Sequence, residues 1–195
     1  ARAFYKPRNP RDMRVKLGLD PDVFTILLTA GGAGLNPAQA VAVARAIGMI
    51  GRPYQVICNA GHNESLRREF EAVAFPHATK VIVQGFTDRM VDYMQASDII
   101  CCKAGWLTIN EVLVMQKPLL IYDAVPGHEE QNVRYVTSNH FGIFAPDPSA
   151  AKQHLERLMD SPDEFADYVA AMKAARTNAS PFPRLTALFR AYLEK

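Results

Sequence analysis

The chain has few cysteines, little net charge and no long apolar run. Its 195 residues include three cysteines, and 22 basic residues against 20 acidic ones give a formal net charge of +2. So small a charge argues against nucleic acid as a partner. A helix that crosses a bilayer needs about 20 consecutive apolar residues, and no segment is that long. Apolar residues make up 49% and charged residues 22%, which is typical of a globular protein.

The cysteines indicate the redox compartment of the protein, and the first residues indicate how the segment relates to a longer protein. Cys58, Cys101 and Cys102 lie in apolar, strand-like segments without zinc spacing, so we expect reduced core thiols in a reducing compartment. No secretory signal opens the sequence. The opening residues, ARAFYKPRNPRD, are typical of a linker. We therefore predict an interdomain linker over residues 1–20 of a longer protein.

Apolar strands alternate with helical segments along most of the chain. The predicted strands are Val23–Thr29, Tyr54–Cys58, Lys80–Val83, Asp98–Cys102, Leu119–Tyr122 and Gly142–Phe144. The predicted helices are Pro37–Ile50, Asn63 or Glu64 to Ala74, Asp88–Gln95, Thr108–Met115 and Glu130–Ser138. Asn36 is expected to cap the first of these helices. The alternation predicts an α/β fold: a Rossmann-like, doubly wound parallel sheet of about six strands, with helices on both faces.

The remaining chain is predicted to be helical. Leu155, Leu158 and Met159 mark one helix, and an apolar stripe from Phe165 to Met172 marks another. The predicted domain covers residues 21–180. Residues 181–195 form a last predicted helix with its own apolar stripe. That stripe faces either the core or a domain absent from this chain.

The glycine loop after the first predicted strand, AGGAG, matches the dinucleotide fingerprint only in part. The pattern G-x-G-x-x-G fits at Gly32 and Gly34 but fails at Pro37. The acidic residue expected after the second strand is missing, because that strand ends Cys58-Asn59-Ala60-Gly61. No G-x-x-x-x-G-K-[ST] loop is present either. A dehydrogenase or P-loop enzyme is disfavoured, although the glycines still allow a ligand to approach the backbone closely.

The segment from Lys103 to Glu111 is more specific. Gly105 and Thr108 lie where a helix begins, and the free N–H groups and positive dipole there favour phosphate. Thr108 and Glu111 have the spacing of a capping box. Alternatively, Glu111 accepts hydrogen bonds from a ribose diol. Lys103 either neutralises a diphosphate or is a solvated strand end.

The loop from Val125 to Asn132 carries donors and acceptors at nearly every position. Hexose hydroxyls need such a mixture, although acidic residues are also favoured at any helix N-terminus. His128 beside Glu129 and Glu130 suggests a metal cluster, but no second histidine follows at helical spacing. No metal site is therefore predicted.

Taken together, these motifs carry a resemblance. The spacing G-G-x-G, G-F-T-D-R-M, K-A-G-x-x-T-I-x-E and P-G-x-E-x-x-N resembles the C-terminal domain of MurG-like glycosyltransferases. The similarity is greatest to monogalactosyldiacylglycerol synthases and diacylglycerol glucosyltransferases, which have the two-domain GT-B architecture. It covers roughly residues 4 to 195 and implies that this chain is the donor-binding half.

The resemblance implies a role for each motif. The glycine loop would line the cleft, Phe86, Thr87 and Met90 would surround the uracil, and the helix from Gly105 would meet the diphosphate and ribose. The implied donor-binding residues are Gly31, Gly32, Gly34, Phe86, Thr87, Met90, Lys103, Gly105, Thr108, Glu111, Glu129, Gln131 and Asn132.

The resemblance also implies a reaction. Such enzymes move a hexose from a UDP-sugar to diacylglycerol with inversion, without a metal or other cofactor at the donor site. The acceptor base lies in the other domain, so no catalytic residue is expected here and the chain alone should be inactive. Peripheral contact with the inner face of the membrane, from the cytoplasm, is implied for the whole enzyme.

Two alternatives stay open. One is a peptidoglycan-type N-acetylglucosamine transferase, and the other is a non-catalytic nucleotide-sugar-binding subunit. The choice between galactose and glucose is open too, because Trp106-Leu107, His128 and Gln131 depart from the usual residues of the galactolipid synthases.

Overall fold

The computed structural model describes residues 8–32 and 36–178. A six-stranded, wholly parallel sheet with the order β3-β2-β1-β4-β5-β6 forms its centre. The strands are β1 Thr25–Thr29, β2 Tyr54–Asn59, β3 Ala78–Gln84, β4 Ile99–Lys103, β5 Leu119–Asp123 and β6 Gly142–Phe144. The predicted α/β class and strand number are confirmed.

The central strands are buried on both faces, which explains their predominantly apolar sequences. Every residue of β1 and β2 is buried, and Leu27 pairs with Ile57 on one side and Ile100 on the other. Strands that are covered on both faces lose the polar alternation of a half-exposed sheet. Cys58, Cys101 and Cys102 are free thiols within this core, as predicted.

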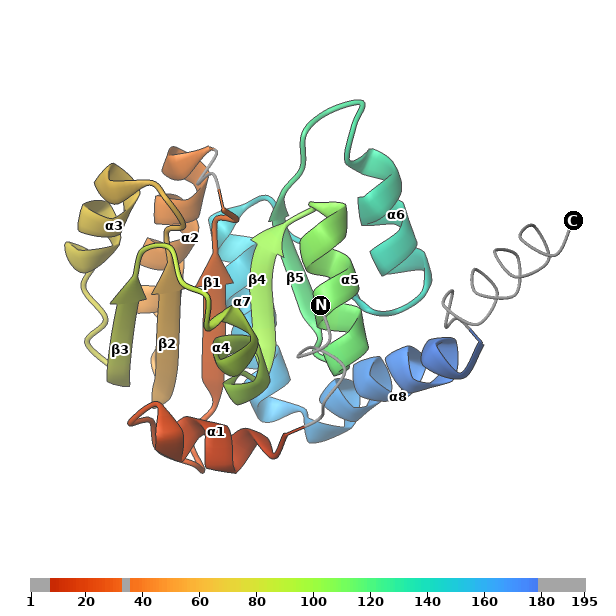
Figure 1. Ribbon diagram of the computed structural model, residues 1–195, viewed down its shortest axis with the longest axis horizontal. Helices are drawn as coiled ribbons and strands as arrows, with labels where there is room; N and C mark the ends of the chain where they lie inside the picture. Colours follow the sequence, from red (N-terminus) through yellow and green to blue (C-terminus); the bar gives the residue numbers. More distant parts are fainter. Residues whose placement is uncertain (1–7, 33–35, 179–195) are drawn as a thin grey trace, which may run out of the picture.

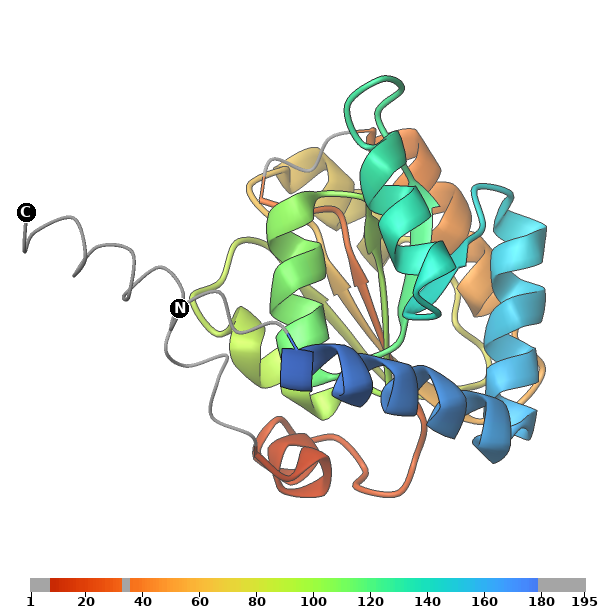
Figure 2. The same cartoon turned by 90° about the vertical axis from the view of Figure 1, so that its right-hand side faces the viewer.

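Helices cover both faces of the sheet. The helices are α1 Pro10–Lys16, α2 Pro37–Gly48, α3 Glu64–Glu71, α4 Met90–Ala96, α5 Trp106–Met115, α6 Glu130–Ser138, α7 Pro148–Asp160 and α8 Pro162–Asn178. Helices α2 and α7 pack together on one face, and α4 and α5 cover the other, as Figures 1 and 2 show. Within the described ranges, no helix is both long and apolar enough to traverse a bilayer.

The segment predicted as a linker contains a docked helix. α1 lies across the amino ends of the strands and packs against α4 (Figure 1). Met13 and Arg14 are buried, so residues 10–16 form a packed helix that the sequence analysis did not predict. The helix was not predicted because its sequence is rich in charged residues, and one of its two buried residues is an arginine. A linking role for residues 1–20 stays a prediction.

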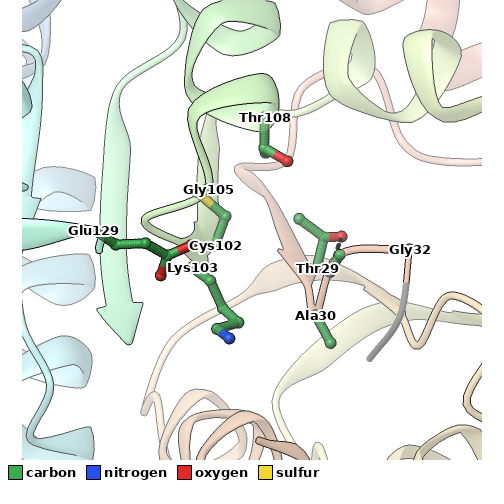
Figure 3. Close-up of a pocket in the computed structure, with 9 residues that line it drawn as sticks. Thr29, Ala30, Gly32, Cys102, Lys103, Gly105, Thr108 and Glu129 are labelled. Carbon is green, nitrogen blue, oxygen red and sulfur yellow. Dashed lines mark hydrogen bonds between the residues drawn. The ribbon is translucent and has the colours of Figure 1, made fainter. Parts of the chain in front are cut away.

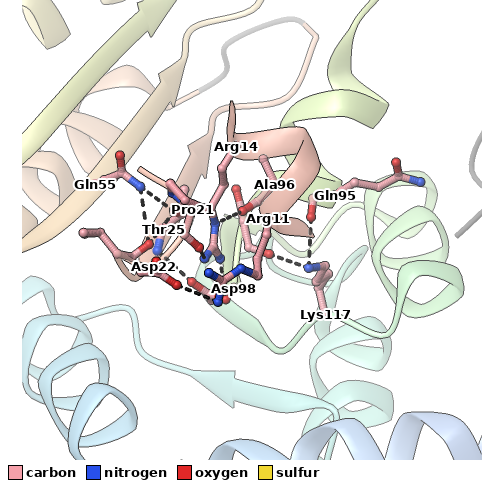
Figure 4. Close-up of polar contacts among 12 residues, drawn as sticks. Arg11, Arg14, Pro21, Asp22, Thr25, Gln55, Gln95, Ala96, Asp98 and Lys117 are labelled. Carbon is pink, nitrogen blue, oxygen red and sulfur yellow. Dashed lines mark hydrogen bonds and ion pairs between the residues drawn. The ribbon is translucent and has the colours of Figure 1, made fainter. Parts of the chain in front are cut away.

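A polar network attaches α1 to the sheet (Figure 4). Arg14 donates hydrogen bonds to the carbonyls of Ala96 and Pro21 and lies 2.6 Å from the Asp98 carboxylate. Asp98 in turn accepts a hydrogen bond from the backbone N–H of Thr25, the first residue of β1. These partners belong to different segments of the chain, so Arg14 joins those segments at the amino ends of the strands.

Lys117 lies in the same network, just before β5. Its ammonium donates to the carbonyls of Gln95 and Ser97, and burial lowers its pKa to about 8. The basic residues of α1 also have acidic partners: Arg11 pairs with Asp22, and Lys16 pairs with Asp92. They are therefore not a free basic surface.

Other differences from the predicted elements are small. Helix α4 begins at Met90 and not at Asp88, and β3 extends two residues earlier and one later than predicted. The predicted last helix, over residues 181–195, lies outside the described residues, as does its stripe of Leu185, Leu188, Phe189 and Tyr192.

Candidate functional site

A pocket of ≈ 180 Å³ lies where the strand order reverses, between the carboxyl ends of β1 and β4. Strands on either side of this point connect in opposite directions, so their loops separate and leave a crevice. Side chains and backbone from β1, β4, α5 and the loop before α6 surround it (Figure 3). The lining residues are Thr29, Ala30, Gly31, Gly32, Cys102, Lys103, Gly105, Thr108 and Glu129.

The glycine loop after β1 forms one wall. Gly31 has a φ of 74°, which favours glycine, and its N–H donates to the hydroxyl of Thr29 at 3.3 Å. The loop also rests against Gly61, where an added Cβ would lie 2.3 Å from the Gly31 carbonyl oxygen. Only glycine at position 61 permits this approach. Gly34, which the sequence placed in the same loop, lies outside the described residues.

The N-terminus of α5 forms the facing wall. Gly105 is the N-cap residue and, having no side chain, leaves the first-turn N–H groups without a side-chain cap. Thr108 lies in the first turn, three residues after Gly105, so the alternative in which Thr108 and Glu111 form a capping box is wrong. The helix begins two residues earlier than predicted, at Trp106, so Trp106 and Leu107 belong to its first turn.

Lys103 brings a positive charge to the pocket. Its ammonium lies 3.5 Å from the Asp123 carboxylate, and the Lys103 side chain is only 12% exposed. Asn36 also donates to Asp123, at 3.0 Å. Asn36 has a φ of 51° and makes no side-chain cap, so its predicted capping role is wrong. It instead joins the start of α2 to the end of β5.

The loop before α6 contributes Glu129. Its carboxylate accepts a hydrogen bond from the backbone N–H of Val125 at 2.9 Å, and an added Cβ at Gly105 would lie 3.8 Å from its Oε1 atom. Asn132 donates to the Ala104 carbonyl at 2.9 Å and so holds α6 against the start of α5. Asn132 and the exposed Gln131 do not line the pocket.

The other predicted residues lie outside the pocket lining. Phe86 is 64% exposed in the loop between β3 and α4. The Thr87 hydroxyl accepts a hydrogen bond from the Arg89 N–H, and Met90 packs partly against the core. Glu111 is half-buried on the same face of α5 as Thr108, one turn further on, and burial raises the pKa of its carboxyl.

The structure thus brings together six of the predicted residues, namely Gly31, Gly32, Lys103, Gly105, Thr108 and Glu129. The sequence reasoning missed Thr29, Ala30 and Cys102. These three residues could have been predicted from their position, because each lies at or next to the carboxyl end of a buried strand. Across residues 8–32 and 36–178, no group of three histidine, cysteine or acidic side chains is arranged to hold a metal ion.

The pocket lies where open α/β sheets bind their ligands, and the comparison with known families assigns this domain to a class. Residues 25–188 match the model of the glycosyltransferase family 28 C-terminal domain, so the chain belongs to that family. The GT-B resemblance expected from the motifs is confirmed.

Two curated relatives are more specific. The chain is 33% identical over 175 residues to the probable monogalactosyldiacylglycerol synthase 2 of Oryza sativa subsp. indica, covering 86% of this chain and 37% of that protein. It is 30% identical over 165 residues to the processive diacylglycerol beta-glucosyltransferase of Staphylococcus saprophyticus, covering 84% of this chain and 41% of that protein. The chain therefore spans about two fifths of the length of these relatives.

A solved structure supports the fold. Acinetobacter baumannii MurG superposes with a TM-score of 0.68 at 19% identity, over 87% of this chain and 50% of MurG. The superposition confirms the Rossmann-like half of a GT-B architecture.

Proposed function

We propose that this chain is the donor-binding half of an inverting glycosyltransferase that moves galactose or glucose from a UDP-sugar to diacylglycerol. The observation that carries the proposal is the pocket at the sheet reversal, which is closed by the uncapped N-terminus of α5. The names of the two curated relatives favour diacylglycerol as the acceptor over a peptidoglycan precursor.

The pocket has the chemistry that a diphosphate needs. The N–H groups of the first turn of α5 supply donors and a partial positive charge, and Lys103 adds a full charge. When the glycosidic bond to UDP breaks, negative charge grows on the leaving phosphate. Donors fixed in place stabilise that charge without a metal. No metal or other cofactor is therefore proposed at the donor site.

The remaining donor groups extend from both sides of the diphosphate. Glu111, on the face of α5 below Thr108, is proposed to accept the ribose hydroxyls. Glu129 is proposed to contact the hexose. Gln131 and Asn132 are proposed to join it when the segment around the start of α6 moves toward the bound sugar. Phe86, Thr87 and Met90 are proposed to surround the uracil.

The other half of the enzyme is proposed to supply the rest. No residue of this pocket is assigned as the base that deprotonates the acceptor hydroxyl, so the chain alone is expected to bind the donor and transfer nothing. Acceptor binding and peripheral contact with the cytoplasmic face of the membrane would belong to the full-length protein.

The single tryptophan gives a convenient assay. Trp106 follows Gly105 at the pocket wall and is 51% exposed, so its fluorescence should respond to a bound diphosphate. Calorimetric and fluorescence titrations with UDP, UDP-galactose, UDP-glucose and UDP-N-acetylglucosamine are expected to show saturable binding that Glu111→Ala weakens. Absence of binding for all four ligands would refute the proposal, and tightest binding of UDP-N-acetylglucosamine would favour the peptidoglycan-type alternative.

A further inference from the structure

One carboxylate oxygen beside the pocket has two donors near it. The Nδ2 atom of Asn36 donates to the Oδ2 atom of Asp123 at 3.0 Å, and the Nζ atom of Lys103 lies 3.5 Å from the same oxygen. The first distance is that of an ordinary hydrogen bond, whereas hydrogen bonds from an ammonium to a carboxylate are usually about 2.7 to 2.9 Å long. The asparagine amide therefore holds this oxygen more closely than the lysine does.

The backbone directs the Asn36 side chain away from its own helix. Asn36 precedes Pro37, the first residue of α2, and has a φ of 51°, in the left-handed region that asparagine tolerates better than most residues. Its side chain makes no bond to the N–H groups of α2. The partner is fixed as well, because the carbonyl of Asp123 accepts a hydrogen bond from the Ala104 N–H at 2.9 Å.

This contact bears on the pocket because it affects the hold of Asp123 on Lys103. Among the lining residues that the structure describes, Lys103 is the one with a positive charge. The Lys103 and Asp123 side chains are only 12% and 19% exposed, so water screens their attraction only in part. A donor on the carboxylate offsets part of its negative charge and weakens its attraction for a neighbouring cation.

We propose that Asn36 is a positioning residue for Lys103. By donating to the shared oxygen, Asn36 keeps Lys103 from closing on Asp123 and leaves the ammonium available to the diphosphate of the donor. Asn36 acts through Asp123 and is not assigned a contact with the donor itself. The assignment rests on the proposed function, since it requires a diphosphate in the pocket.

Asn36→Gly tests the proposal, because glycine keeps the left-handed backbone and removes only the amide. Without that donor, Lys103 is expected to close on Asp123. UDP and inorganic pyrophosphate are then both expected to bind roughly 2- to 10-fold more weakly, the range expected for one hydrogen bond. Calorimetric titrations measure the two affinities, and melting curves establish that each variant is folded.

A double variant shows whether Asn36 acts through Asp123. In the Asp123→Asn background the carboxylate is absent, so adding Asn36→Gly is expected to leave UDP affinity unchanged. Asn139→Gly is the matched control on the wild-type background. Asn139 is also exposed, but it follows α6 and donates to the Tyr135 carbonyl at 2.8 Å, so its replacement is expected to have no effect on either ligand.

The outcomes separate this inference from the proposed function. If wild type binds UDP and Asn36→Gly binds it equally well, asparagine serves only the backbone conformation at this position, and the positioning role is wrong. If Asn36→Gly weakens UDP binding equally in the Asp123→Asn background, Asn36 does not act through Asp123, and the role is again wrong. If wild type binds neither UDP nor pyrophosphate, the proposed function fails, and this inference fails with it.

Discussion

Lys103 and Asp123 end the adjacent strands β4 and β5, where they face each other after a shift in the register, and the Lys103 ammonium lies 3.5 Å from the Asp123 carboxylate. The pair controls the one positive side chain in the part of the lining that the structure describes, because Lys103 lines the pocket beside Glu129 and Asp123 offsets the charge of Lys103. Both side chains are largely buried, at 12% and 19% exposure, so the interaction is only partly screened by water.

Replacing Lys103 should weaken UDP binding, whereas replacing Asp123 should strengthen it. Lys103→Met removes a charge-assisted donor to the diphosphate, and we expect UDP to bind roughly 10- to 100-fold more weakly. Asp123→Asn removes the competing negative charge, and we expect tighter binding by a few-fold. Titrations of both variants at one ionic strength test the pair. Equal affinity in Lys103→Met and wild type would remove Lys103 from the site.

The docked helix α1 should contribute to stability through Arg14. The Arg14 side chain is 7% exposed, and removing its charge takes away the 2.6 Å ion pair with Asp98. We expect Arg14→Met to lower the free energy of unfolding by roughly 3 kcal/mol, as when one partner of a buried pair is lost. Denaturant unfolding measures this change.

Arg11→Met provides the comparison on the same helix. The Arg11–Asp22 pair is exposed on both sides, at 61% and 63%, so its loss should cost less than about 1 kcal/mol. Equal losses in the two variants would mean that α1 is not anchored by Arg14.

Acid should destabilise the domain partly through His154. Burial, and then the nearby Arg157, lowers the pKa of this histidine from 6.5 to about 4. Between these values the folded state binds fewer protons than the unfolded state, so the free energy of unfolding falls as the pH drops from about 6.5 to 4. His154→Leu should show a shallower decline over that interval. Parallel curves for variant and wild type would contradict the assignment.

The buried thiols should be unreactive while the protein is folded. Burial raises the pKa of Cys58 and of Cys102 to about 12, so almost no thiolate forms at pH 8. A chromogenic disulfide reagent should titrate no thiol in the native protein and all three after unfolding. Rapid labelling of the native protein would show that the core opens readily.

The sequence predicted the sheet well because its information is local. Runs such as TILLT and YQVIC are mostly apolar and do not alternate with charged residues, which is typical of a strand covered on both faces. The reversal of strand order then brings the glycine loop and Gly105 together, and six of the thirteen expected site residues line the resulting pocket.

The features that the sequence did not predict depend on contacts between distant segments. The helix α1 is explained by Arg14 meeting Asp98, which lies 84 positions away along the chain. Asn59 was noted only because an acidic residue was missing there, whereas its side chain joins two loops through Gly85 and Gly61. The start of α5 at Trp106 was missed because no side-chain cap marks it. Neither the hydrophobic pattern of a segment nor the helix propensity of its residues contains information about contacts with distant segments.

The most direct test of the account is to locate bound UDP on the folded chain by amide NMR. If the pocket at the sheet reversal holds the diphosphate, the largest UDP-induced shifts should fall on the backbone amides of Gly31, Gly32, Trp106, Leu107 and Thr108. Two results would contradict this account: shifts confined to the amino ends of the strands, around α1 and the start of β3, or no shifts at saturating UDP.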